Sequence, residues 1–369
     1  MVTVSDVLEA LGEAYPWELA DEGSPAGLLV GSRNAPVRKV LCSIELTGEV
    51  VEAAAATRSE LLIAHHPHLL NRSHAPFDED TPGGRITRMA ITEGVNIAAC
   101  YRNADVAQGG AADLMAAKLD LVGARPLVPL SVGYMAKVVV FVPPEAVEAV
   151  FSAMADEGAG AGGDYTHAGF RTFGTGTFLP GESAMPYTGE VGKLSQVEEN
   201  RLEMACPSYR VKAVVDAMLE QHPYEEVAYD VLRTEADVPW GIGRIGNLAE
   251  ERKLLDIMED MAAWSASEEA ALVGDPDMGA TRVAVAPGPG DKLVERGWRE
   301  GADLMVAGEL GWNATVEACE AGMAVLTLGH LESERALVPA MVDIIRMAAE
   351  SEGWQLEIEG YKDRGGRWG

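Results

Sequence analysis

Two adjacent histidines, His65 and His66, directly follow the short apolar run 61–64 and stand before Pro67. Four apolar residues are typical of a buried strand, and proline cannot continue strand pairing, so we expect both imidazoles at the carboxyl end of a strand. Ligands bind at this edge of α/β sheets. The pair therefore indicates a metal site; the alternative is a surface pair whose side chains point to opposite faces.

A second segment of the same design lies near the other end of the chain. The apolar run 323–328 is followed, after one glycine, by His330, and a helical apolar pattern then extends to Ile345. If that helix begins near Leu331, His330 and Glu334 lie about one turn apart and project to one side.

A third apolar run, 95–100, leads to Asp105. Together the three segments offer nitrogen and oxygen ligands at strand ends, a mixture that suits Zn, Mn or Fe. Taken alone, each residue has a simpler explanation. His330 is then a capping or core histidine, Glu334 a solvated helix residue, and Asp105 a helix cap. The expected ligand set is His65, His66, Asp105, His330 and Glu334.

The amino-acid composition argues against some classes of binding partner. The 369 residues include 58 acidic and 29 basic side chains, a net charge of −29, which disfavours nucleic acid and anionic membranes as partners. No stretch is apolar enough to span a bilayer, and the N-terminal residues do not resemble a signal peptide, so we expect a cytoplasmic protein. Four widely spaced cysteines without a Cys-x-x-Cys motif argue against a disulfide framework and a thiolate zinc site.

Strand and helix patterns alternate in two parts of the chain, 38–120 and from about 281 onward. The sequence 59–66 also resembles 302–309. We therefore predict an α/β fold in which two related α/β lobes, 1–132 and 235–369, form one metal-binding core whose strand ends face a single cleft.

The segment 133–234 has a different pattern of apolar residues from the two lobes. This pattern predicts the order β-α-β-β-α-β of a ferredoxin-like α+β insertion. Within it, the run 174–177 and the loop 180–186 contain glycine, proline and threonine. These stretches either hold a ligand or form a simple turn and a loop.

Several motifs together resemble the Nif-three-like family, the hexameric proteins with a dinuclear metal centre also called GTP cyclohydrolase I type 2 homologues. The resemblance covers nearly the whole chain, and the insertion is similar to the PII-like or CutA-like domain of longer members. The motifs are Ala64-His65-His66-Pro67, Asn103-Ala104-Asp105 with Gly109-Gly110, Ala307-Gly308-Glu309, Gly329-His330 with Ser333-Glu334, Trp17 with 27–31, and, in the insertion, 158–160 and 222–226.

The resemblance implies two divalent metal ions per chain (Zn, Mn or Fe), with Glu334 bridging them. His65 and Asp105 would complete one site, and His66 and His330 the other. It also implies a homo-oligomer, a hexamer, with itself as partner.

The chain departs from the family pattern around these ligands. Tyr101 replaces a histidine, Glu45 stands where aspartate is usual, and Trp312-Asn313 follows Glu309 where histidines are often seen. These differences bear on the substrate and on any general acid more than on metal binding.

Two functions are compatible with these features. The first is a metal-dependent hydrolase acting on a nucleotide such as GTP, or on a related small molecule, through a metal-activated water. Glu309 is then the candidate general base, and Tyr101 or Arg102 stabilises developing charge; otherwise Glu309 caps a helix and Arg102 forms a surface ion pair. The second is a non-catalytic metal-binding regulator or metal-delivery protein whose insertion senses a ligand.

No nucleotide-binding fingerprint accompanies these residues. The glycine-rich run 241–246 lacks the expected strand-to-helix context, and 288–290 lacks the Lys-Ser/Thr of a P-loop.

Overall fold

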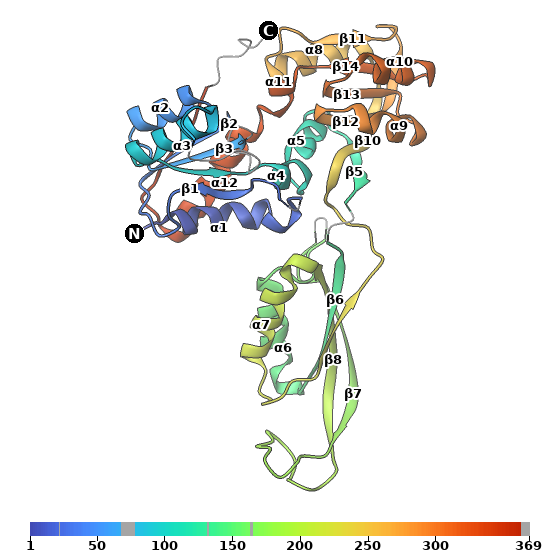
Figure 1. Cartoon of the computed structure of the whole chain (residues 1–369). Coiled ribbons are helices and arrows are strands. Elements are labelled where there is room, and N and C mark those ends of the chain that lie inside the picture. The colour runs from blue at the N-terminus through green and yellow to red at the C-terminus, as the bar shows by residue number, and fades with distance from the viewer. Residues whose placement is uncertain (22, 68–77, 131–132, 163–164, 363–369) are drawn as a thin grey trace. The chain divides into compact units, whose positions relative to one another are not determined.

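The computed structural model describes residues 1–21, 23–67, 78–130, 133–162 and 165–362. The chain divides into two units, shown in Figure 1. The core unit comprises 1–130 together with 239–369, and the inserted unit comprises 131–238. The expected boundaries at 133 and 234 fall inside the inserted unit.

The first sheet of the core unit has five strands, parallel except for the antiparallel edge strand β1. Its order is β1 (Gly27–Val30), β4 (Asn96–Ala99), β3 (Leu61–His66), β2 (Lys39–Glu45) and β15 (Glu357–Gly360). Helices cover both faces (Figure 1), because both faces of these strands are apolar. The helices are α2 (Gly48–Ala56) and α3 (Pro82–Glu93) on one face, and α1 (Val4–Ala14) and α12 (Leu337–Glu352) on the other.

The second sheet has six strands. Its order is β11 (Ala271–Val273), β14 (Ala324–Thr327), β13 (Leu304–Glu309), β12 (Gly279–Pro289), β10 (Gly241–Lys253) and β5 (Val122–Pro129). Successive residues of its central strands enter different cores, as strand geometry requires. One core contains α5 (Ala111–Lys118) and α8 (Leu254–Ser265), and the other contains α9 (Val294–Arg299) and α10 (Trp312–Glu320).

The two sheets repeat one arrangement, and the predicted α/β fold is confirmed. In each, three consecutive parallel strands end in an antiparallel edge strand: β2, β3, β4 with β1, and β12, β13, β14 with β11. The similar sequences 59–66 and 302–309 thus supply the equivalent strands β3 and β13.

Membership of the sheets does not follow the expected lobe boundaries. β15 and α12, near the C-terminus, pack on the first sheet through β2, whereas β5 and α5 pack with β10 on the second. The helix expected to run on from Leu331 is also two helices, α11 (His330–Glu334) and α12. The glycine-rich run 241–246 is part of strand β10, not a loop.

The inserted unit is one antiparallel sheet with two helices. Apolar side chains of both helices pack on one face of β6 and β8 around Val138, Val140 and Met204. Its elements are β6 (Met135–Val142), α6 (Val147–Asp156), β7 (Gly169–Phe178), β8 (Ser195–Pro207), α7 (Val211–Gln221) and β9 (Tyr229–Arg233), with the strands ordered β7-β8-β6-β9. Within the described residues of the chain, no helix is long and apolar enough to cross a membrane.

Candidate metal centre

The histidine pair closes strand β3. Leu61 to Ala64 are completely buried, and this apolar run carries His65 into the interior, where its side chain has no exposed surface. The His66 side chain is 11% exposed, and the two ring centroids lie 4.5 Å apart. The alternative of a surface pair facing opposite ways is therefore wrong.

Asp105 reaches the pair from the short helix α4 (Arg102–Val106), which follows β4. The buried Asn103 holds this helix in place, since its amide donates to the Tyr15 carbonyl at 2.8 Å and its carbonyl accepts from the Tyr101 N–H at 3.0 Å. Asp105 Oδ1 then lies 3.3 Å from His65 Nε2. Asp105 does not cap the following helix α5, which begins after Gly110.

His330 and Glu334 come from α11, one turn apart on the same side, as expected. Ser333 fixes this turn: its hydroxyl accepts from the Gly288 N–H at 2.9 Å and donates to the His330 carbonyl at 2.7 Å. Gly288 has φ of 64°, and a Cβ there would lie 2.6 Å from Glu334 Oε1. Only glycine combines this backbone conformation with room for the carboxylate.

The three imidazoles converge on one carboxylate oxygen. Glu334 Oε2 lies 3.0 Å from His66 Nε2, 3.6 Å from His330 Nε2 and 3.9 Å from His65 Nε2. His65, His66 and Glu334 form a group whose ligand atoms all lie within 4.8 Å of one another and could hold a metal ion. The structure thus brings all five expected ligands together, with Asp105 beside His65 and His330 beside Glu334.

Each imidazole is oriented by an acceptor at its other nitrogen. The Nδ1 atom of His65 lies 2.8 Å from the Cys100 carbonyl, that of His66 lies 2.7 Å from Glu45 Oε1, and that of His330 lies 3.0 Å from Glu309 Oε1. A hydrogen at Nδ1 satisfies these acceptors and leaves Nε2 with its lone pair directed at the centre. Metal-binding histidines are characteristically held in this way.

The centre is incomplete as a set of hydrogen bonds. His65 Nε2, Asp105 Oδ1 and Glu334 Oε2 are buried and have no hydrogen-bond partner among the residues that the structure describes. Such atoms are rare in native interiors, because each costs desolvation free energy without compensation. A cation between them would satisfy all three, so the donor set fits a metal ion.

The electrostatics favour a cation as well. Burial works to lower the pKa of His66, but the carboxylates of Glu334 and Glu45 raise it to about 10. Burial also works to lower the pKa of His65, but the carboxylate of Asp105 outweighs this effect and the pKa of His65 is raised. The same negative potential that retains protons here would attract a divalent ion in their place.

The two candidate catalytic residues have different surroundings. Glu309 ends strand β13, is 58% exposed and contacts His330; it does not cap α10, which begins after Gly311. The Tyr101 ring centroid lies 5.9 Å from that of His65 and 6.1 Å from that of His66. Burial, followed by the charge of Asp105, raises the pKa of Tyr101, so its hydroxyl is a proton donor at neutral pH.

Arg102 is a partner of the centre and not only of the surface. Its guanidinium contacts Asp105 Oδ2 and Asp21 Oδ2, each at 3.3 Å. The orienting roles of Glu45, Gly288 and Ser333 were not predicted from the sequence. Of the three, only Glu45 could have been recognised as a neighbour of the site, because it ends β2 at the same edge of the sheet at which His66 ends β3.

Comparisons with known proteins agree with this fold. The profile of the Duf34/NIF3 (NGG1p interacting factor 3) family matches residues 2–364. The Bacillus subtilis protein named GTP cyclohydrolase 1 type 2 homolog is 35% identical over 330 residues, covering 89% of this chain and 88% of the relative. Its Mycobacterium tuberculosis namesake is 32% identical over 357 residues, covering 94% and 92%.

A solved structure, that of a Bacillus cereus protein related to NIF3, superimposes with a TM-score of 0.87 at 33% identity and covers 100% of this chain and 98% of that one. Staphylococcus aureus protein SA1388 has a TM-score of 0.73 at 20% identity over 100% of this chain and 98% of its own, which shows the shared fold. The chain therefore belongs to the Duf34/NIF3 family.

Proposed function

We propose that this chain is a metal-dependent hydrolase that holds two divalent cations and acts on a nucleotide or a related small molecule. One observation carries the proposal: three imidazoles, each oriented through Nδ1, present Nε2 to the buried carboxylate of Glu334, whose Oε2 has no hydrogen-bond partner within the described part of the chain.

The contacts suggest how the ligands divide between two ions. Asp105 lies next to His65, which favours these two residues as one site. The His66 and His330 rings lie 5.2 Å apart, which favours these as the other. Glu334, within 4 Å of all three histidines, would bridge the two sites. Zn, Mn and Fe all suit such ligands.

When bound, divalent ions supply Lewis acidity that makes water a nucleophile near neutral pH. The chain's own residues have separate tasks. Glu309 holds His330 through one oxygen, and its exposed carboxylate is the candidate proton acceptor. The protonated Tyr101 hydroxyl is the candidate donor to charge that develops on the substrate.

A substrate would approach from the side of the second sheet. His330 is 38% exposed and Glu309 is 58% exposed, whereas His65 and Glu334 are buried. The relatives' name, GTP cyclohydrolase 1 type 2 homolog, makes GTP the first compound to test. We also propose, from the family resemblance, a homohexamer that works in the cytoplasm.

The decisive experiment measures metal content and turnover on the same samples. After reconstitution with Zn, Mn or Fe, elemental analysis should give about two ions per chain. Protein loaded in this way should consume GTP, and Glu334→Gln should abolish both binding and turnover. Glu332→Gln, two residues away on α11 and paired with Arg335, is the control and should preserve both.

The outcomes separate the parts of the proposal. A metal content near zero in all reconstituted samples would exclude the metal centre. Two bound ions without turnover of any nucleotide would exclude the hydrolase and leave a regulator or a metal-delivery protein.

A further inference from the structure

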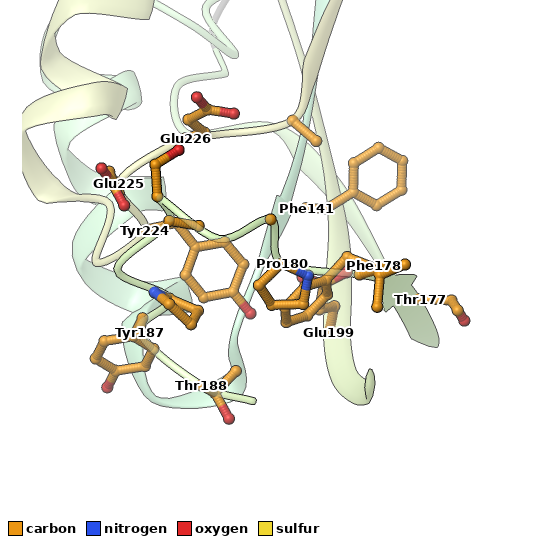
Figure 2. Close-up of a pocket in the computed structure, with 16 residues that line it drawn as sticks. Phe141, Thr177, Phe178, Pro180, Tyr187, Thr188, Glu199, Tyr224, Glu225 and Glu226 are labelled. Atoms are coloured by element: carbon orange, nitrogen blue, oxygen red, sulfur yellow. The ribbon is translucent and has the colours of Figure 1, made fainter. Parts of the chain in front are cut away.

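The inserted unit contains a cavity of about 570 Å³. It lies between the ends of β7 and β8, the segment 179–188 and the segment 224–228 after α7 (Figure 2). All five residues of the metal centre belong to the core unit. The cavity is thus independent of the proposed hydrolase activity.

Aromatic rings form part of its wall. The Tyr224 ring lies in the middle of the labelled side chains in Figure 2, and its centroid is 5.8 Å from that of Tyr187. On another side, His222 contacts Tyr224 at a centroid distance of 4.9 Å. The Tyr187 hydroxyl donates to Glu145 Oε1 at 3.2 Å, and Tyr224 hydrogen-bonds Glu199. Both rings are therefore held in place by carboxylates.

The charged residues of the wall are all acidic. Glu199, Glu225 and Glu226 line the cavity, and among its lining residues that the structure describes none is basic. Glu225 Oε2 accepts from the Met185 N–H at 3.0 Å, which joins the segment 179–188 to the segment after α7.

Gly176 makes room for one of these carboxylates. A Cβ at this position of β7 would lie 2.0 Å from Glu199 Oε2, so any other residue would displace the carboxylate from its place beside Tyr224. The glycine-containing run 174–177, for which the sequence is compatible with a turn or a ligand site, is a segment of strand β7 that leaves room for Glu199.

Carboxylates and tyrosine rings in the wall of one cavity are suited to one class of ligand. An ammonium group is attracted to the ring faces and forms charge-assisted hydrogen bonds with the carboxylates. Phosphates and other anions would be repelled. A bare divalent ion would use the oxygens only and would leave most of a cavity of this size unfilled. We propose that the cavity binds a small organic cation, an alkyl or aryl ammonium.

The test is calorimetric titration of the full chain with tetramethylammonium, 2-phenylethylammonium and spermidine. The neutral 2-phenylethanol and the anionic phenylacetate serve as matched compounds. At least one ammonium should bind ten or more times more tightly than both matched compounds. Failure of all three ammonium probes to bind at 10 mM, or equal binding of 2-phenylethanol, would overturn the proposal.

Two variants assign the binding to this cavity. Glu199→Gln keeps an acceptor for Tyr224 but removes the charge, and it should weaken ammonium binding about tenfold or more. Glu190→Gln is the control, an exposed residue paired with Lys193, and should bind as the unmodified chain does. Equal affinity in both variants, or displacement of the ammonium by an equimolar amount of calcium chloride, would contradict the proposal.

Discussion

Arg244 of β10 and Asp113 of α5 form a bidentate ion pair, with Arg244 Nε 2.5 Å from Asp113 Oδ1 and Nη2 2.9 Å from Oδ2. The guanidinium is buried, and its remaining hydrogens reach the carbonyls of Gly241, Gly243 and Ala107. Ala107 follows the metal-ligand candidate Asp105 by two residues. The pair thus joins the second sheet to the segment that positions one expected ligand.

Arg244→Met should destabilise the core unit strongly. The substitution leaves the Asp113 carboxylate, only 25% exposed, without its cation, a loss of about 3 kcal/mol by analogy with other broken buried pairs. Arg125→Met is the matched control, since the Arg125 side chain is 46% exposed and its partner Glu300 keeps a second cation, Arg296; pairs of this kind contribute under about 1 kcal/mol. Urea unfolding of both variants provides the comparison. Equal unfolding midpoints for the two variants would show that the buried pair is not needed for the stability of the core unit.

The metal-ligand candidates could be predicted because their signals are local. An apolar run that ends at His65 places that histidine at the end of β3 whatever the rest of the chain does, and His330 and Glu334 are related by one helical turn. The partners that orient them could not be predicted. The contacts between Glu45 and His66 and between Ser333 and Gly288 depend on how strands and helices distant in sequence are placed.

Strands β5 and β10 were missed for a different reason. Their glycines and prolines are poor strand formers, and β5 is mostly exposed. The pairing explains two of the glycines. A Cβ at Gly241 would lie 2.5 Å from the Val128 carbonyl, and one at Gly246 would lie 3.0 Å from Leu121 Cβ. The close approach of the two backbones overrides intrinsic propensity at these positions.

The carboxylates behind the histidines should control metal affinity. Glu45→Ala removes the acceptor at His66 Nδ1, and Glu309→Ala removes the one at His330 Nδ1. Each should weaken metal binding by about 10- to 100-fold, as is usual for residues that orient metal ligands. Competition with a chromophoric chelator measures the affinity. Glu52→Ala, a substitution at an exposed position of α2, should leave the metal affinity unchanged. Unchanged affinity in the Glu45 and Glu309 variants would show that neither carboxylate orients its histidine for metal binding.

His222 should make the inserted unit sensitive to acid. Its Nδ1 accepts from the Tyr224 N–H at 3.1 Å and its Nε2 lies 2.9 Å from the Phe141 carbonyl, so the folded form holds a neutral ring. Burial lowers the pKa of His222. The unfolded chain, with a histidine pKa of about 6.5, therefore takes up a proton first as the pH falls, and stability is lost between that value and the lower folded pKa.

His222→Gln replaces the donor and the acceptor with an amide that does not titrate. Its inserted unit should lose less stability between pH 7.5 and pH 5.5 than that of the unmodified chain. The measure is the urea concentration at which peptides from α7 lose protection from hydrogen exchange. His167→Asn removes an exposed histidine of the same unit and should leave the pH dependence unchanged; an equal loss in the His222 variant would mean that this ring does not titrate on unfolding.

The core unit should fold without the inserted unit. Where the insertion leaves and returns, the Leu130 N–H contacts the Trp240 carbonyl at 3.5 Å, and Pro129 pairs with Gly241 across β5 and β10. Because the two ends are neighbours in a ladder, a linker of about four Gly/Ser residues in place of 131–238 can close them as a hairpin. The shortened chain should bind metal and should keep the oligomeric size of the full chain.

A second deletion, 122–238, also removes β5 and so exposes the β10 edge of the second sheet; this chain should aggregate. Light scattering and elemental analysis distinguish the outcomes, and aggregation of both deletions would show that the core unit needs its insertion to fold.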